Sequence, residues 1–276
     1  MISHKNIIVT GASSGIGKSI MDELVAQEGN RILAACRHSE RITGYGENVI
    51  PFSCDLSTKE GVDALFARAE ELFDRIDLYF YNAGAPYYER FDYENWDRIQ
   101  KLFDLNTVSH IYTYSKYLNH LNGREGRLVY TISAMGEMAL PGYALYAATK
   151  FAMKGFQQAI RDETPENLQI SCVYPVSTRT NFFNVGGGGR KMEPPFPIQA
   201  PEKVGKAVVK GVSRLKDHIY PCSVYLPSKY LMNIVPPVKT LYVKAQKSKL
   251  RRFVKRIEAE ERGILEDIKL KHEIRK

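Results

Sequence analysis

The feature that most constrains this chain is a regular alternation of short apolar runs with longer segments of helical periodicity. The apolar runs predict strands at residues 6–10, 31–36, 48–52, 77–81, 127–132, 167–174 and 218–220. Strands that are apolar on both faces are buried on both faces, and strands that alternate with helices form parallel sheets. We therefore predict an α/β fold, a Rossmann-type doubly wound parallel sheet in one domain, with helices on both faces.

Such sheets bind ligands at the carboxyl ends of their strands. Directly after the first predicted strand comes a glycine-rich loop that opens into a helical segment, with the candidate binding residues Gly11, Ser13, Ser14, Gly15, Ile16 and Gly17. Glycines let backbone amides approach a diphosphate, and a helix N-terminus favours an anion. A glycine-rich turn without a ligand is the alternative, but the strand before and the helix after it favour dinucleotide binding.

The residues at the end of the second predicted strand indicate which dinucleotide the chain binds. Sheets that bind NAD usually place an acid here, which holds the ribose 2′-hydroxyl. This chain has Cys36 at that point, followed by Arg37. A guanidinium can bind a 2′-phosphate with two hydrogen bonds, whereas a carboxylate would repel it. The sequence therefore favours NADP(H) as the cofactor.

A group of three polar residues predicts the chemistry. Ser133 follows the fifth predicted strand, and Tyr146 and Lys150 stand four residues apart, on one face of a predicted helix. A tyrosine has an ordinary pKa of about 10, and a nearby ammonium lowers it. Tyr146 could then act as general acid in reduction and general base in oxidation, while Ser133 donates a hydrogen bond to the substrate oxygen.

From about residue 6 to 220 the chain resembles the short-chain dehydrogenase/reductase family. The resemblance rests on motifs in the family's order, at residues 10–17, 54–56, 81–84, 106, 133, 146 with 150, and 174–175. It implies catalytic roles for Asn106, Ser133, Tyr146 and Lys150, with Asn106 bending its helix and holding a water beside Lys150. It implies further contacts to the cofactor from Asp55, Leu56, Asn82, Ala83, Gly84, Tyr146, Lys150, Pro175, Thr178 and Thr180.

Two residues depart from the family pattern. Tyr81 stands where the family usually has asparagine, and Val176 stands where it usually has glycine after Pro175. Neither change removes a catalytic group, although Val176 adds bulk beside the nicotinamide position. We therefore predict an NADP(H)-dependent oxidoreductase that moves a hydride between the nicotinamide and a carbonyl or secondary alcohol. A catalytically silent dinucleotide sensor, or a membrane-associated adaptor on the same fold, is the alternative.

The residues after position 180 predict the substrate class. Four consecutive glycines at 186–189 and several prolines up to 197 indicate a lid that covers the substrate, lined by some of Phe182, Phe183, Met192 and Phe196. The opposite wall is expected from Met135, Met138, Leu140 and Tyr143. These side chains favour an apolar ketone, aldehyde, lipid or steroid-like compound. An unstructured loop with ordinary packing is the alternative.

The C-terminal region carries the positive charge of the chain. Residues 239–276 hold 13 Lys and Arg against 6 Asp and Glu, whereas residues 1–238 hold 26 against 25. We predict a catalytic domain over residues 1–238 and a basic amphipathic helical tail over 239–276, with Val243, Leu250, Val254 and Ile257 on one face. Such a helix can lie on an anionic membrane, or pack on the body or a second subunit with its charges solvated.

Composition and spacing exclude several other classes. The near-neutral body argues against a nucleic-acid binder, and the scattered cysteines and histidines predict no metal site. No leader precedes the first strand and no run of about 18 apolar residues occurs, so we expect a cytoplasmic protein, with membrane contact only through the tail. The resemblance implies a small-molecule substrate and a homodimer or homotetramer.

Overall fold

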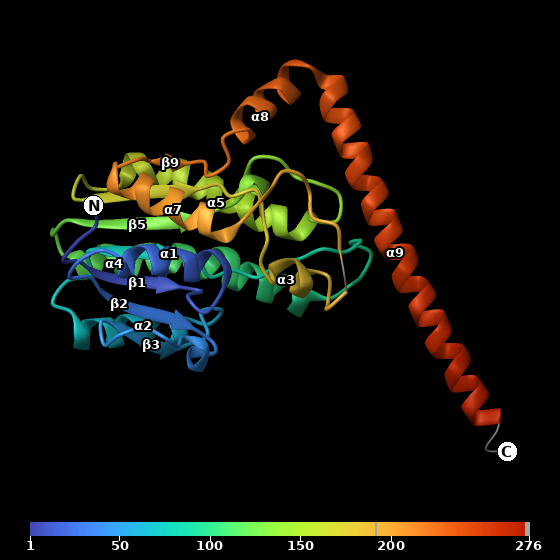
Figure 1. Ribbon diagram of the computed structural model, residues 1–276, viewed down its shortest axis with the longest axis horizontal. Helices are drawn as coiled ribbons and strands as arrows, with labels where there is room; N and C mark the ends of the chain where they lie inside the picture. The colour runs from blue at the N-terminus through green and yellow to red at the C-terminus, as the bar shows by residue number, and fades with distance from the viewer. Residues whose placement is uncertain (191, 274–276) are drawn as a thin grey trace.

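The computed structural model describes residues 1–190 and 192–273 (Figure 1). Lys191 of the predicted lid and residues 274–276 of the predicted tail lie outside the described residues. The central sheet has the strand order β3-β2-β1-β4-β5-β6-β9, with every neighbouring pair parallel. Its strands are β1 (Asn6–Thr10), β2 (Arg31–Cys36), β3 (Val49–Ser53), β4 (Leu78–Tyr81), β5 (Gly126–Thr131), β6 (Leu168–Val173) and β9 (His218–Ile219).

Helices cover both faces of this sheet, as predicted. One face carries α1 (Gly15–Val25) and α7 (Pro201–Ser213), which pack on each other. The opposite face carries α2 (Lys59–Leu72), α4 (Ser109–Leu121) and α5 (Ala144–Glu163). Apolar side chains of the strands point alternately into the two layers, so that each layer has its own buried core. The strand order reverses between β1 and β4, which places the expected ligand crevice there.

The predicted helical region 95–121 consists of three parts. It begins as α3 (Trp96–Phe103), widens into a π-helical turn at Asp104–Val108, and continues as α4. π turns within helices are often found at functional sites. Asn106 lies in this turn, so the helix is irregular where the family resemblance implies a bend.

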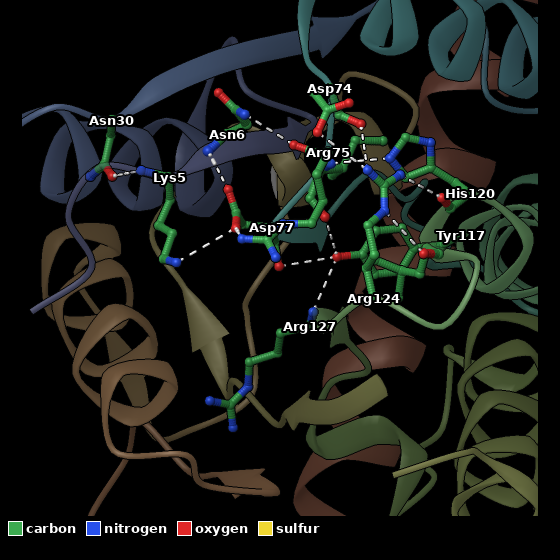
Figure 2. A network of polar contacts seen from close by, with 12 residues as sticks. Lys5, Asn6, Asn30, Asp74, Arg75, Asp77, Tyr117, His120, Arg124 and Arg127 are labelled. Carbon is green, nitrogen blue, oxygen red and sulfur yellow. Dashed lines mark hydrogen bonds and ion pairs between the residues drawn. The ribbon is translucent and has the colours of Figure 1, made fainter. Parts of the chain in front are cut away.

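A polar network fixes the amino ends of the strands (Figure 2). Asp77, just before β4, accepts a hydrogen bond from the Asn6 amide at 2.9 Å and forms ion pairs with Lys5 and Arg75. The Tyr117 hydroxyl donates to the carbonyl of Asp77 at 3.1 Å and accepts from the amide of Arg127. These contacts tie β1, β4, β5 and α4 together at the edge opposite the expected ligand site, which makes them structural.

The chain after β9 forms two helices that stand beside the body (Figure 1). α8 (Tyr225–Ile234) leads into the long α9 (Pro236–Glu273), which runs past the carboxyl edge of the sheet. Pro236 and Pro237 begin α9, where their missing N–H groups need no partner. None of the helices described is long and apolar enough to cross a membrane.

The face that α9 turns to the body also differs in part from the prediction. Leu250 and Ile257 do pack against the body, but Phe253 and Gln246, which the prediction omitted, are the most buried side chains over residues 236–263 of α9. The Phe253 ring lies edge-on to Tyr88, with the ring centroids 5.0 Å apart. α9 is therefore docked on the catalytic body. The division of the chain at residue 238 stays a prediction.

Over residues 1–190 and 192–273, two short strands and three short helices complete the fold. β7 (Ser177–Thr178) and β8 (Ile198–Gln199) pair in parallel and bracket the segment predicted to be the lid. The short helices are α6 (Phe182–Gly186), and the 3-10 turns at Ser39–Arg41 and Ala134–Gly136.

Candidate active site

The loop after β1 has the geometry of a backbone cradle. Gly11 and Gly15 have positive φ angles of 65° and 57°, which side chains rarely adopt. A Cβ at Gly17 would lie 2.2 Å from the Gly11 carbonyl oxygen, so only glycine fits there. Ser14 precedes α1 in an extended conformation, and its side chain does not cap the helix. The first N–H groups of α1 are therefore left for an external acceptor.

Thr10 holds this loop to the neighbouring strand. Its hydroxyl accepts hydrogen bonds from the amides of Asn82 and Ala83, both at 3.0 Å, and donates to the carbonyl of Phe80 at 3.3 Å. The Asn82 side chain accepts from Thr131 on β5 and packs beside Gly11 and Gly17. The structure therefore places Asn82 beside the glycine-rich loop. Thr10 was not among the predicted site residues, although it begins the glycine-rich motif.

Arg37 and Asp55 lie next to each other at the ends of β2 and β3. The Arg37 side chain is exposed, and its carbonyl accepts from Ser53 at 2.9 Å. Burial acts to raise the pKa of Asp55, but hydrogen bonds from Ser57 and the charge of Arg37 outweigh it and lower that pKa. Asp55 is therefore a fixed anion, and Leu56 beside it is buried in the core.

Ser133, Tyr146 and Lys150 converge on one pocket, as the sequence predicted. Ser133 has a φ of 106°, a strained value for a residue with a side chain, and its hydroxyl accepts from the Met135 amide at 3.2 Å. Tyr146 and Lys150 lie one turn apart on α5, with the Lys150 Nζ atom 5.7 Å from the centroid of the Tyr146 ring. The ammonium donates to the Thr131 carbonyl at 3.2 Å.

Burial dominates the electrostatics of this group. It raises the pKa of Tyr146 to about 12, although a hydrogen bond with Ser133 acts in the opposite direction. It also lowers the pKa of Lys150 to about 8. The sequence led us to expect a phenol pKa lowered by the ammonium. In the protein without cofactor this expectation is wrong. Both side chains are buried away from water, and the Lys150 ammonium donates to the Thr131 carbonyl.

Asn106 secures the loop that follows β4. Its Oδ1 atom accepts from the Ala85 amide at 2.8 Å, and its Nδ2 atom donates to the Ala85 carbonyl at 3.0 Å and to Thr149 at 3.3 Å. A Cβ at Gly84 would lie 3.2 Å from Asn106 Oδ1 and 3.8 Å from Lys150 Nζ. Asn106 is thus close to Lys150, and its amide is engaged in the described contacts by protein partners.

The segment after β6 forms the opposite side of the cradle. The Pro175 carbonyl accepts from the Ala134 amide at 2.9 Å, and the buried Thr178 hydroxyl donates to the Val176 carbonyl at 3.0 Å. A Cβ at Gly15 would lie 2.9 Å from the Thr180 methyl group, so this segment closes over the loop. Val176 packs against Cys222 and Tyr225 and lines the pocket.

One open pocket contains these groups, and its lining is mostly apolar. Met135, Met138, Leu140 and Tyr143 form one wall, and Phe182, Phe183 and Phe196 of the predicted lid form another. Met192 does not line the pocket itself but is buried in the adjoining apolar cluster, together with Tyr143 and Phe253. The remaining wall was not predicted, and it comes from the C-terminal helices through Tyr225, Ser228, Lys229, Met232 and Tyr242.

α9 holds the predicted lid segment in place through four polar contacts. The Tyr242 hydroxyl donates to the Phe196 carbonyl at 2.7 Å, and Lys249 donates to the Pro194 carbonyl at 3.0 Å. Two ion pairs add to these, Arg252 with Glu193 at 3.1 Å and Arg190 with Glu260 at 2.9 Å. The tail is therefore a strap across the substrate side of the pocket. No signal in the local sequence pattern could have shown this contact between distant segments.

Glu137 anchors α8 beside the pocket and was also missed. Its buried carboxylate forms ion pairs with Lys154 of α5 at 3.0 Å and Lys229 of α8 at 2.8 Å. It accepts further hydrogen bonds from the hydroxyls of Tyr220 and Tyr225. Burial acts to raise the pKa of Glu137, but these two ammonium groups outweigh it and lower that pKa. Glu137 therefore stays ionised and fixes one wall of the pocket.

Comparison with known proteins identifies the family. A family model described as short chain dehydrogenase matches residues 5–186, which is more than half of the chain. The chain belongs to the short chain dehydrogenase family. The predicted resemblance, the fold and the expected class of oxidoreductases are thereby confirmed.

Named relatives and solved structures agree with this assignment. A 3-dehydrosphinganine reductase of Danio rerio is 27% identical over 227 residues, covering 76% of this chain and 68% of the relative. A 3-ketodihydrosphingosine reductase of Bos taurus is 27% identical over 223 residues, covering 74% and 67%. A short-chain dehydrogenase from Sphingobium yanoikuyae in complex with NADPH has a TM-score of 0.72 at 21% identity, covering 84% and 94% of the two chains.

One solved neighbour carries the other dinucleotide. A short chain dehydrogenase/reductase from Burkholderia phymatum in complex with NAD has a TM-score of 0.73 at 17% identity, covering 87% of this chain and 97% of the other. The shared fold therefore does not decide between the two cofactors, and the choice depends on residues such as Arg37. Among the described residues, no group of three or more His, Cys, Asp or Glu side chains could hold a metal ion.

Proposed function

We propose that this protein is an NADP(H)-dependent oxidoreductase that interconverts an apolar ketone or aldehyde and its alcohol. One observation carries the proposal. Tyr146, Ser133 and Lys150 lie in the same pocket as Asn82, Gly84 and Thr180, which reach the dinucleotide loop. A proton donor and an ammonium thus lie beside a cradle built for a diphosphate.

The residues present fit the proposed cofactor. The glycine positions leave a cradle that any Cβ would fill, and the first amides of α1 face it. At the adenosine end, the exposed Arg37 supplies the positive charge that a 2′-phosphate needs, and no acid follows β2 directly. We infer that Asp55, Leu56, Ala83 and Gly84 line the adenosine side. Pro175, Thr178 and Thr180 would hold the nicotinamide side.

The catalytic roles follow from burial and charge. When bound, NADPH supplies the hydride. Because burial raises the pKa of Tyr146 to about 12, its phenol is protonated at neutral pH and can donate a proton to the substrate oxygen. Ser133 donates a hydrogen bond to the same oxygen as negative charge develops on it. Lys150, with a pKa of about 8, is largely cationic at pH 7 and favours the phenolate that remains.

The pocket supports a long, apolar substrate. Its lining is mostly apolar, and aromatic and sulfur-containing side chains contribute much of it. The named relatives are reductases of 3-dehydrosphinganine and of 3-ketodihydrosphingosine. We therefore propose a carbonyl compound with an extended hydrocarbon chain, of which 3-dehydrosphinganine is the first to test. The strap formed by α9 would order the wall of the pocket that contacts the hydrocarbon chain of the substrate.

A coupled activity measurement tests the proposal. Purified protein is mixed with NADPH and either 3-dehydrosphinganine or a short ketone, and NADPH consumption and alcohol product are both measured. We expect the wild type to reduce the long substrate. Tyr146→Phe should reduce it at least about 100-fold more slowly. Tyr143→Phe is the matched control, because Tyr143 lines the same pocket and its hydroxyl has no partner among the described residues.

Two outcomes separate the alternatives. Tight NADPH binding without reduction of any carbonyl would favour the silent sensor over the enzyme. Equal rates in Tyr146→Phe and wild type would contradict the assigned proton donor. A cytoplasmic location, a homodimer or homotetramer and the absence of nucleic-acid partners stay predictions, which fractionation and sedimentation velocity would test.

A further inference from the structure

We propose that the corner between α8 and α9 docks on an anionic lipid bilayer. We define the elbow as residues 230–241, the end of α8 and the first turns of α9. In Figure 1 this corner stands away from the sheet and its covering helices. The docking surface is a different one from the amphipathic face predicted from sequence, because that face of α9 packs on the body through Leu250 and Ile257.

The elbow exposes apolar side chains that the described residues leave open to solvent. Its strongly exposed members are Ile234 at 78%, Leu241 at 71%, Tyr230 at 59% and Leu231 at 51%. Helices of monomeric proteins in water normally turn polar side chains outward. A cluster of exposed apolar residues at one corner instead indicates a surface that meets another apolar phase.

α8 has one face that lines the pocket and another that is apolar and exposed. Tyr225, Ser228, Lys229 and Met232 recur at helical spacing and line the pocket. Tyr230, Leu231 and Ile234 recur at the same spacing on another face and are exposed. The exposed face of α8 therefore lies on the outer side of the same helix whose other face forms a wall of the pocket. An amphiphilic compound that leaves the bilayer at the elbow would directly meet the wall of the pocket that α8 forms.

The positive charge around the elbow indicates which kind of partner it binds. From residue 218 to 257 the chain contains nine Lys and Arg and no Asp or Glu. Lys239, Lys244 and Lys247 are exposed, and none of them forms an ion pair within the part of the chain that the structure describes. A second copy of the chain docked through the same elbow would bring like charges together. An anionic lipid surface would accept both the cations and the apolar side chains.

Vesicle flotation tests the docking without any need for turnover. The full-length protein is floated with vesicles of phosphatidylcholine alone and of phosphatidylcholine with phosphatidylserine. We expect binding to the anionic vesicles, and binding weaker by about tenfold or more in the double variant Ile234→Glu with Leu241→Glu. Charge removal in Lys239→Gln, Lys244→Gln and Lys247→Gln should weaken binding by about fivefold for each lysine.

The matched control is Leu215→Glu, at an apolar residue that is 63% exposed and precedes β9 at the opposite, amino end of the sheet. It should bind vesicles like wild type. Circular dichroism and NADPH affinity should be unchanged in all variants, since none of the substituted residues lines the pocket.

Three results would overturn the docking proposal. These are no flotation of wild type with anionic vesicles, equal flotation of the elbow variant and Leu215→Glu, or a wild-type dimer in sedimentation velocity that the elbow variant abolishes. Because flotation requires neither substrate nor catalysis, failure of the proposed reaction would leave this result standing.

Discussion

Replacing Lys150 with methionine should stabilise the free protein while removing its activity. Lys150 is 3% exposed and no carboxylate pairs with it among the described contacts. Its pKa falls from the ordinary 10.5 to about 8 because of burial. Since a tenfold change in proton affinity corresponds to about 1.4 kcal/mol, holding this ammonium in the fold costs about 3 kcal/mol at neutral pH.

The substitution also removes a favourable contact, which offsets part of the gain in stability. The Thr131 carbonyl would lose its hydrogen bond from Lys150, which removes about 1 kcal/mol. Methionine has a similar length and fills the space with apolar atoms. We therefore expect the free energy of unfolding of Lys150→Met to exceed that of wild type by about 2 kcal/mol at pH 7.

The dependence on pH distinguishes this cause from better packing. Below about pH 8 Lys150 is charged in both the folded and the unfolded states, so its full cost is present. Between about pH 8 and 10.5 the unfolded state binds more protons than the folded state, and the wild type gains stability through this group as pH rises. The advantage of Lys150→Met should therefore be largest at pH 6–7 and vanish by about pH 10.

Urea unfolding of the cofactor-free protein, followed by circular dichroism from pH 6 to 10, measures this difference. Lys206→Met is the control, because Lys206 lies on the exposed side of α7 and its ammonium stays in water. The reasoning is refuted if Lys150→Met is less stable than wild type at pH 7, or if its advantage is the same at every pH.

Three further predictions concern the cofactor and the tail. Arg37→Glu should raise the Kd for NADPH at least about tenfold more than the Kd for NADH, measured by fluorescence titration, and an equal effect on both would remove Arg37 from the 2′-phosphate site. Gly17→Ala should abolish dinucleotide binding in calorimetry, because its Cβ would lie 2.2 Å from the Gly11 oxygen; wild-type affinity would contradict the cradle. Phe253→Ala should lower the free energy of unfolding by about 3 kcal/mol and raise KM for a long-chain carbonyl. No change in either would show that α9 is not docked.

The sequence was sufficient for the sheet and the catalytic end of the site because both depend on local patterns. Buried parallel strands are continuous apolar runs, and the residues after them meet at one edge of the sheet. Tyr146 and Lys150 share a helix face by their spacing alone. The elements were accordingly predicted to within a few residues, and these side chains were correctly predicted to converge with Ser133.

The substrate side was predicted incompletely because it depends on contacts between distant segments. Phe253 and Tyr242 reach the pocket region only because α8 turns the chain back over the body. The buried charge of Glu137 depends on partners 17 and 92 residues further along the chain. The direction of the Tyr146 pKa likewise depends on burial, which the spacing of Tyr146 and Lys150 does not reveal.

The central claim is that hydride passes from the nicotinamide to a carbonyl carbon in this pocket. The most direct measurement uses NADPH deuterated on each face of C4 in turn, with mass spectrometry of the alcohol formed from 3-dehydrosphinganine. The account predicts one deuterium on the carbinol carbon from one of the two labelled cofactors and none from the other. An unlabelled alcohol from both cofactors, or no alcohol while NADPH is bound, would contradict it.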